Sequence, residues 1–292
     1  MLKQWLKNIA KAFGMSHFLS RAAGYSPVRL FLALKAKRLY QKYYIESCSN
    51  YSSSPLVNKQ LANVGIVAIR NPLNLDSEYI NRICDEFKNG GNVVSYDFGF
   101  YKEGIVEGAN AFYLKTKKLI STGIIDRLFD SGILAMLEGH LGTNVRLVNT
   151  SCFKICPNDF IDEGSFIWHR DSQPDHSYKL IVYLTDVEEC DGAFRYMGGT
   201  HLDYNGLAQF GNSRLKGHRS EEGTVYEGSA SDGVLFNNNG FHLGGRSIRN
   251  DRVVVVFNFK PSLTPCRDYF KKYSCGGVSD LEFYANPYAV WW

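Results

Sequence analysis

From residue 144 onward, apolar residues occur in short runs of the kind that form β-strands. The runs are rich in Val, Ile, Tyr and Phe and are bounded by Gly, Asp, Asn or Pro, which favour turns. A series of such strands predicts an antiparallel double-sheet barrel of the jelly-roll or cupin type. The runs are NVRLVNTSCFKI at 144–155, YKLIVYLTDV at 178–187, AFRYMGGTH at 193–201, DGVLFNNN at 232–239 and RVVVVFNFK at 252–260.

The chain between residues 65 and 142 combines one strand with amphipathic helices. The run GIVAI at 65–69 predicts a buried strand that ends before Pro72. DSEYINRICDEF at 76–87 has the pattern of an amphipathic helix, and the segment 117–142 predicts one or two helices that end at Gly142. The predicted fold class is therefore α+β, mainly β, with N-terminal helices flanking a β core.

These patterns divide the chain into four parts without an internal repeat. A polar stretch, ESCSNYSSSP, separates a helical arm from the β-rich body, and the last segment is unusually aromatic and is expected to pack on that body. The expected parts are a basic amphipathic helical arm at 1–45, a linker at 46–57, the β-rich body at 58–262 and the aromatic tail at 263–292.

The basic charge of the chain is concentrated in the arm. Residues 1–45 contain nine Lys or Arg and no acid, which leaves 24 basic and 29 acidic residues in the remainder, so we expect no nucleic-acid partner. In this arm, apolar residues recur at helical spacing and form one stripe, and lysines lie outside that stripe. The pattern is typical of a helix at a membrane interface, of a helix packed on the body, or of a mitochondrial transit peptide. The stripe is Leu2, Trp5, Leu6, Ile9, Ala10 and Phe13, and the lysines are Lys3, Lys7 and Lys11.

The cysteines and the hydropathy indicate a cytoplasmic protein. Seven cysteines form an odd set without a C-x-x-C, which favours reduced thiols over disulfides or a structural zinc cluster. No run approaches the roughly 18 apolar residues of a spanning helix. A lipid-binding arm would place the protein peripherally at the membrane surface, and the sequence gives no oligomeric state.

Candidate metal ligands occur in the stretch FIWHRDSQ, where His169 and Asp171 stand two residues apart. Side chains at i and i+2 of a strand point to the same face, so an imidazole and a carboxylate can converge there. His242 is the best third ligand, since it follows a strand in a loop rich in Gly and Asn. Two histidines and one carboxylate form the facial arrangement of non-haem Fe(II) oxygenases.

Arg252 follows His242 by ten residues and begins the run RVVVVFNF. A guanidinium at the start of a strand can enter the barrel and hold a carboxylate through two hydrogen bonds. Arg246 and Arg249 are alternatives, but the pattern places both in a loop. An H-x-D pair with a distal histidine and a trailing arginine in a strand series is a specific combination.

The body resembles the phytanoyl-CoA dioxygenase-like branch of the Fe(II)/2-oxoglutarate-dependent oxygenases. The resemblance is carried by LANVGIVAIRNPL, WHRD, LIVYLTDVEECDGAFRYMGGTH and GFHLGGRSIRNDRVVVVFNF and covers about residues 58–262. It implies a double-stranded β-helix with His169, Asp171 and His242 as iron ligands. It also implies that Arg252 binds the distal carboxylate of 2-oxoglutarate and that dioxygen is the oxidant.

The resemblance also suggests cosubstrate contacts and one departure from the family pattern. Lys154 stands where some family members place a lysine that contacts the cosubstrate. Gly244 replaces a serine that is frequent in relatives, so one cosubstrate hydrogen bond is either missing here or supplied elsewhere, with Ser247 and Asn258 as candidates. His201 ends GGTH, which resembles the family's Pro-Gly-Ser-His turn, and is expected to be structural rather than a ligand.

Four interpretations of function remain open. The first is a dioxygenase that hydroxylates a small or lipid-linked substrate, such as the Kdo sugar of a lipopolysaccharide precursor at the cytoplasmic membrane surface. The second is a hydroxylase of a soluble acyl or secondary metabolite. The others are a catalytically silent membrane-associated or protein-binding module, which the complete ligand set disfavours, and a cupin using another divalent metal, which Arg252 disfavours. Asp171 favours hydroxylation over halogenation, because halogenating relatives replace this carboxylate. Pocket walls in this family come from variable loops, which are expected at 95–115, 157–165 and 202–230.

Overall fold

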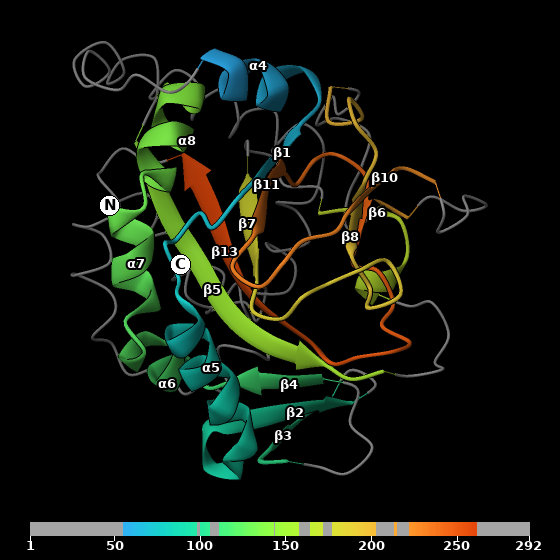
Figure 1. Ribbon diagram of the computed structural model, residues 1–292. Coiled ribbons are helices and arrows are strands. Elements are labelled where there is room, and N and C mark those ends of the chain that lie inside the picture. The colour runs from blue at the N-terminus through green and yellow to red at the C-terminus, as the bar shows by residue number, and fades with distance from the viewer. Residues whose placement is uncertain are drawn as a thin grey trace, which may run out of the picture.

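A computed structural model of the chain places two antiparallel β-sheets face to face, with helices outside the larger one (Figure 1). The predicted antiparallel, mainly β organisation is therefore confirmed. The arm at 1–45, most of the linker and the tail at 263–292 lie outside the described residues. The structure describes residues 55–97, 100–105, 111–142, 144–157, 164–171, 177–202, 213–214 and 222–261.

The larger sheet has the strand order β1-β11-β7-β13-β5-β4-β2-β3 among the described residues. Its central strands are the Val- and Ile-rich runs of the sequence, which are apolar on both faces because both faces are covered. The strands are β1 Ile66–Ile69, β2 Val93–Asp97, β3 Phe100–Glu103, β4 Ala111–Leu114, β5 Val145–Ile155, β7 Tyr178–Tyr183, β11 Gly233–Asn237 and β13 Arg252–Pro261.

The smaller sheet has the order β10-β8-β12-β6-β9 in the part of the chain that the structure describes. From residue 145 onward the chain passes repeatedly from one sheet to the other, so strands distant in sequence become neighbours. In particular, β12 lies between β8 and β6. The strands are β6 His169–Arg170, β8 Phe194–Tyr196, β9 Ser213–Arg214, β10 Thr224–Tyr226 and β12 His242–Leu243.

Alternation along β13 shows which face of the larger sheet meets the smaller one. Val254 and Val256 are buried in one cluster with Ala193, which precedes β8 of the smaller sheet. Val253 and Val255 point the other way and are buried with residues of the helices. Even-numbered residues of β13, from Arg252 onward, therefore face the space between the sheets.

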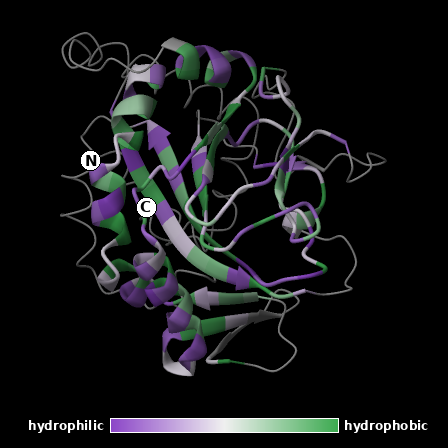
Figure 2. Cartoon of the chain, in the orientation of Figure 1, coloured by the Kyte–Doolittle hydropathy of each residue, from purple (hydrophilic) through white to green (hydrophobic). Residues whose placement is uncertain are grey.

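The helices pack against the outer face of the larger sheet. Ile125 and Leu128 of α7 and Leu137 of α8 are buried with the outward residues of β13, and both helices carry hydrophilic and hydrophobic residues (Figure 2). Within the described residues, no helix has the length and apolar character needed to cross a membrane. The helices are α4 Pro55–Asn63, α5 Ser77–Asp85, α6 Thr116–Ser121, α7 Ile124–Asp130 and α8 Ile133–Leu141, with short 3-10 turns at Glu86–Lys88, Gly90–Asn92 and Gly164–Phe166.

Three local predictions need correction. The segment 117–142 forms three helices rather than one or two, because Gly123 and Gly132 adopt left-handed φ angles of 81° and 78° that interrupt it. Its end at Gly142, with φ 62°, is confirmed. Helix α4 begins at Pro55, a favourable first helical residue, so the end of the expected linker is helical. Much of 95–115 forms strands that extend the larger sheet instead of a loop.

Candidate metal centre

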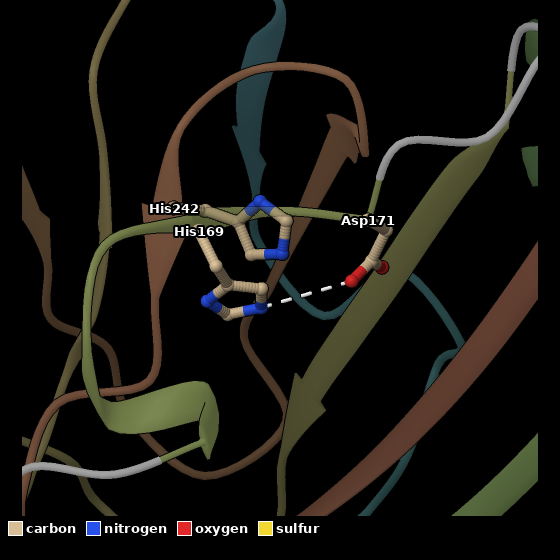
Figure 3. Close-up of side chains that lie close together, drawn as sticks. All are labelled: His169, Asp171 and His242. Carbon is tan, nitrogen blue, oxygen red and sulfur yellow. Dashed lines mark ion pairs between the residues drawn. The ribbon is translucent and has the colours of Figure 1, made fainter. Parts of the chain in front are cut away.

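The register of the smaller sheet brings the two predicted histidine ligands together. β12 pairs with β6 so that His242 lies directly opposite His169, and residues opposite each other in an antiparallel pair share a face. The two ring centroids are 4.3 Å apart. Asp171 follows β6, and its backbone N–H donates to the Asn238 carbonyl at 3.2 Å. Figure 3 shows the three side chains pointing toward one another.

Backbone carbonyls fix the orientation of both imidazole rings. Nδ1 of His169 lies 2.8 Å from the Ile167 carbonyl oxygen, and Nδ1 of His242 lies 2.9 Å from the Gly240 carbonyl oxygen. Because a carbonyl only accepts, each Nδ1 carries the proton and each Nε2 retains its lone pair. Nε2 of His169 is 3.7 Å from Oδ1 of Asp171. Both rings therefore present the nitrogen that binds a metal.

The ionisation states of the site suit a divalent cation. Burial and the neighbouring His169 ring lower the pKa of His242 to about 3, so this ring is neutral near pH 7. Burial alone would raise the pKa of the Asp171 carboxyl, but Lys179, together with the two histidine rings, outweighs that effect and holds the pKa well below its usual range. One carboxylate oxygen and two imidazole nitrogens lie within 4.8 Å of one another, a donor set that fits Fe(II).

Arg252 supplies a buried positive charge between the sheets. The residue is 5 % exposed, and its Nε makes no hydrogen bond within the described residues. Burial lowers the pKa of its guanidinium to about 10, which still leaves it protonated near pH 7. A Cβ built on Gly244, two residues after His242, would lie 3.6 Å from Nη2 of Arg252. The guanidinium thus reaches the neighbourhood of the ligand strand and fits a carboxylate there.

The alternative arginine Arg249 has a different environment. Its Nη2 lies 2.7 Å from Asp191 and 3.0 Å from Glu188, and its side chain is 48 % exposed. The guanidinium of Arg249 is therefore already paired with carboxylates of the protein itself. Arg246 lies in the same loop and is half-buried. Arg252 is the one of the three that is buried.

The structure does not bring Lys154 to this group. Lys154 lies opposite Val253 of β13, so its side chain points to the outer face of the larger sheet. Its Nζ pairs with Asp251 at 2.9 Å. Ser247 is buried and donates its hydroxyl to the Asn250 carbonyl. Asn258 faces inward, since it lies opposite Lys179 of β7.

Lys179 is the functional candidate that the sequence interpretation missed. It lies on β7, and its ammonium contacts Oδ2 of Asp171. The only sequence signal is that a lysine interrupts the apolar run YKLIVYL.

His201 contacts the Ala62 carbonyl at 3.1 Å and does not belong to the ligand group. A cavity of about 340 Å³ lies elsewhere, and its lining includes Tyr79 and Arg127 but none of the ligands.

No protein-family model and no curated protein matches the chain, but solved structures do. The epimerase SnoN, solved in complex with Fe³⁺, α-ketoglutarate and nogalamycin RO, has a TM-score of 0.54 and 16 % identity over 70 % of this chain and 82 % of its own. The non-haem α-ketoglutarate-dependent carbocyclase SnoK from nogalamycin biosynthesis has a TM-score of 0.53 and 13 % identity over 71 % and 84 %. HygX from Streptomyces hygroscopicus, solved with nickel, 2-oxoglutarate and hygromycin B, has a TM-score of 0.50 and 17 % identity over 73 % and 89 %.

At these identities the likeness is one of fold. The chain shares the arrangement of sheets of enzymes that use iron and α-ketoglutarate, over most of the length of those enzymes. Its activity must therefore be argued from its own side chains.

Proposed function

We propose that the chain is an Fe(II)- and 2-oxoglutarate-dependent oxygenase with a double-stranded β-helix core. The observation that carries this proposal is the pairing of two features. His169, Asp171 and His242 offer ligand atoms within 4.8 Å of one another. In the part of the chain that the structure describes, the buried Arg252 has a guanidinium nitrogen without a hydrogen bond. The first fits Fe(II), and the second fits the distal carboxylate of 2-oxoglutarate. A different divalent metal without this cosubstrate would leave Arg252 unexplained.

The three ligand side chains and Arg252 bind different groups. His169 and His242 hold the metal through Nε2 and are kept in that orientation by their carbonyl contacts, while Asp171 neutralises part of its charge. When bound, iron and 2-oxoglutarate supply oxidation of an unactivated C–H bond by dioxygen, with succinate and CO₂ as coproducts. Arg252 orients the cosubstrate. The rings of Phe236 and Phe194, centred 5.0 and 5.8 Å from that of His242, keep this side of the site apolar.

We propose a small, secondary-metabolite-like molecule as the substrate and hydroxylation or a related C–H oxidation as the reaction. SnoN and HygX, which share the fold, were solved with nogalamycin RO and hygromycin B. The presence of Asp171 as a third protein ligand supports oxidation rather than halogenation. Lys154 and Ser247 are left out of the proposed cosubstrate set because of the contacts described above.

The direct test is cosubstrate turnover without a known substrate. Fe(II)-loaded protein, 2-oxoglutarate and air should yield succinate slowly, and His242→Ala should abolish it. Arg252→Ala should require a much higher 2-oxoglutarate concentration. Absence of succinate from an iron-loaded wild type, also after addition of hydroxylated natural-product extracts, would count against the proposal.

A lipid-linked substrate is the second candidate, and the basic amphipathic arm at 1–45 favours it. Within the phytanoyl-CoA dioxygenase-like branch, the Kdo hydroxylases of lipopolysaccharide precursors are the specific form of this candidate. The full chain should then sediment with vesicles containing anionic lipid but not with neutral ones. Changing Lys3, Lys7 and Lys11 together to Glu should release it. Equal behaviour on both vesicle types would leave the soluble-metabolite candidate.

A further inference from the structure

Lys179 occupies an inward position at the start of β7, directly before the apolar part of that strand. Its register partners are Phe236 on β11 and Asn258 on β13. Phe236 is buried together with Phe194 and Tyr196 of the smaller sheet, so residues of this register row face the space between the sheets. Lys179 is thus a charged side chain directed from the larger sheet toward the metal ligands of the smaller one.

The ammonium of Lys179 contacts one specific oxygen of Asp171. Nζ contacts Oδ2, whereas Oδ1 is the oxygen that faces Nε2 of His169 at 3.7 Å. The side chains of Lys179 and Asp171 are only 23 % and 17 % exposed, so water weakens this ion pair less than it weakens a surface pair. The two carboxylate oxygens therefore have different partners before any metal binds.

We propose that Lys179 is a positioning residue that makes Asp171 a ligand through one oxygen, Oδ1. By holding Oδ2, the ammonium keeps the carboxylate from turning both oxygens toward the metal and leaves the remaining coordination positions for cosubstrate and dioxygen. It also ties the ligand of the smaller sheet to the larger sheet. This inference rests on the proposed metal set of His169, Asp171 and His242, but not on 2-oxoglutarate turnover.

Partners of metal ligands outside the coordination sphere usually change metal affinity by about 10–100-fold when removed. Lys179→Met keeps most of the length of the side chain and removes its charge, so it should weaken Mn(II) binding by about 10–100-fold. In the Co(II)-loaded protein, the same variant should alter the visible absorption, because a carboxylate that binds through two oxygens changes the coordination number. Lys179→Arg, which keeps a cationic donor, should restore most of the affinity.

The matched control is Lys118→Met. Lys118 pairs with Glu86 at 2.7 Å, and the two side chains are 32 % and 21 % exposed, so a lysine–carboxylate pair of similar burial is removed on α6. The Lys118→Met variant should have the same Mn(II) affinity and Co(II) spectrum as the wild type. If Lys179→Met does not fold, Lys179→Gln replaces it with the same expectation.

The outcomes separate this inference from the proposed function. A wild type that binds neither Mn(II) nor Co(II) overturns both. A wild type that binds both ions, with Lys179→Met equal to it in affinity and spectrum, overturns the positioning role alone. Tighter Mn(II) binding by Lys179→Met would also overturn it, because the ammonium would then compete with the metal for Asp171.

Discussion

Arg252 combines a cost to folding with a role in binding. A buried guanidinium that lacks a carboxylate partner destabilises a protein by several kcal/mol, because its desolvation is not offset. Burial is also what lowers the pKa of Arg252 to about 10. In our proposal the cosubstrate carboxylate supplies the missing partner. The desolvation free energy of the guanidinium is therefore offset only when 2-oxoglutarate is bound.

Replacing Arg252 should therefore act in opposite directions on stability and binding. Arg252→Met should raise the free energy of unfolding of the cosubstrate-free protein by about 1–3 kcal/mol, by removing a buried charge. The same variant should weaken 2-oxoglutarate binding to the Mn(II)-loaded protein by about 10–100-fold. Urea unfolding and calorimetric titration measure the two effects. A loss of stability without a loss of affinity would show that the guanidinium has a structural partner instead.

His242 gives the metal-free protein a specific pH dependence. Its pKa is about 3 in the folded chain against 6.5 for the free side chain, so the unfolded state binds the proton more tightly. Its contribution to stability is complete above about pH 6.5 and is lost as the pH falls toward 3, by up to about 1.4 kcal/mol per pH unit. His242→Asn should remove this part of the pH dependence, as measured by urea unfolding between pH 7 and pH 4. Parallel curves for the two proteins would contradict a buried neutral ring.

At the scale of elements, the turn between β11 and β12 sets the position of His242. Gly240 provides the carbonyl that orients the ring, and a Cβ built there would lie 2.0 Å from Oη of Tyr196. Tyr196 is fully buried, and its hydroxyl donates to the Asn237 carbonyl at 3.1 Å. The turn and the Tyr196 side chain therefore leave no room for any residue except glycine.

Gly240→Ala should destabilise the fold by about 3 kcal/mol through overpacking and should weaken Mn(II) binding, since the turn that holds His242 must shift. Gly123→Ala is the control. Gly123 has a left-handed conformation, with φ 81°, but a Cβ there meets nothing within 4 Å, so only backbone strain of about 1 kcal/mol is expected and metal binding should not change. Thermal melts and Mn(II) titration of both variants test this. Equal effects of the two changes would mean that the turn tolerates a side chain.

The elements also show how far the sequence alone could predict the structure. The strand runs and the H-x-D with its distal histidine were predictable, because hydrophobic runs mark buried strands and the i, i+2 spacing fixes a common face. The faces of β5 and β7 were not predictable. β7 is mainly apolar on two sides, and β5 mixes polar and apolar residues on both. Only the register with β13 therefore shows that Lys154 points outward and Lys179 inward. The breaks at Gly123 and Gly132 depend on left-handed backbone angles that a helical pattern does not reveal.

At the scale of the whole molecule, the site exists because the chain alternates between two sheets. His169 and His242 are 73 positions apart in sequence yet lie opposite each other in the smaller sheet, while Arg252 and Lys179 reach the same space from the larger one. Each sheet alone carries an incomplete site. A change that loosens the contact between the sheets should therefore reduce metal and cosubstrate binding together.

The measurement that tests the central claim most directly is an anaerobic titration of the Fe(II)-loaded full chain with 2-oxoglutarate, followed by visible absorption. We expect a weak charge-transfer band in the wild type, no band in His242→Ala, and a band in Arg252→Ala only at far higher cosubstrate concentration. Absence of the band from an iron-loaded wild type would contradict the oxygenase proposal, and the three ligands would then have to serve a different metal chemistry.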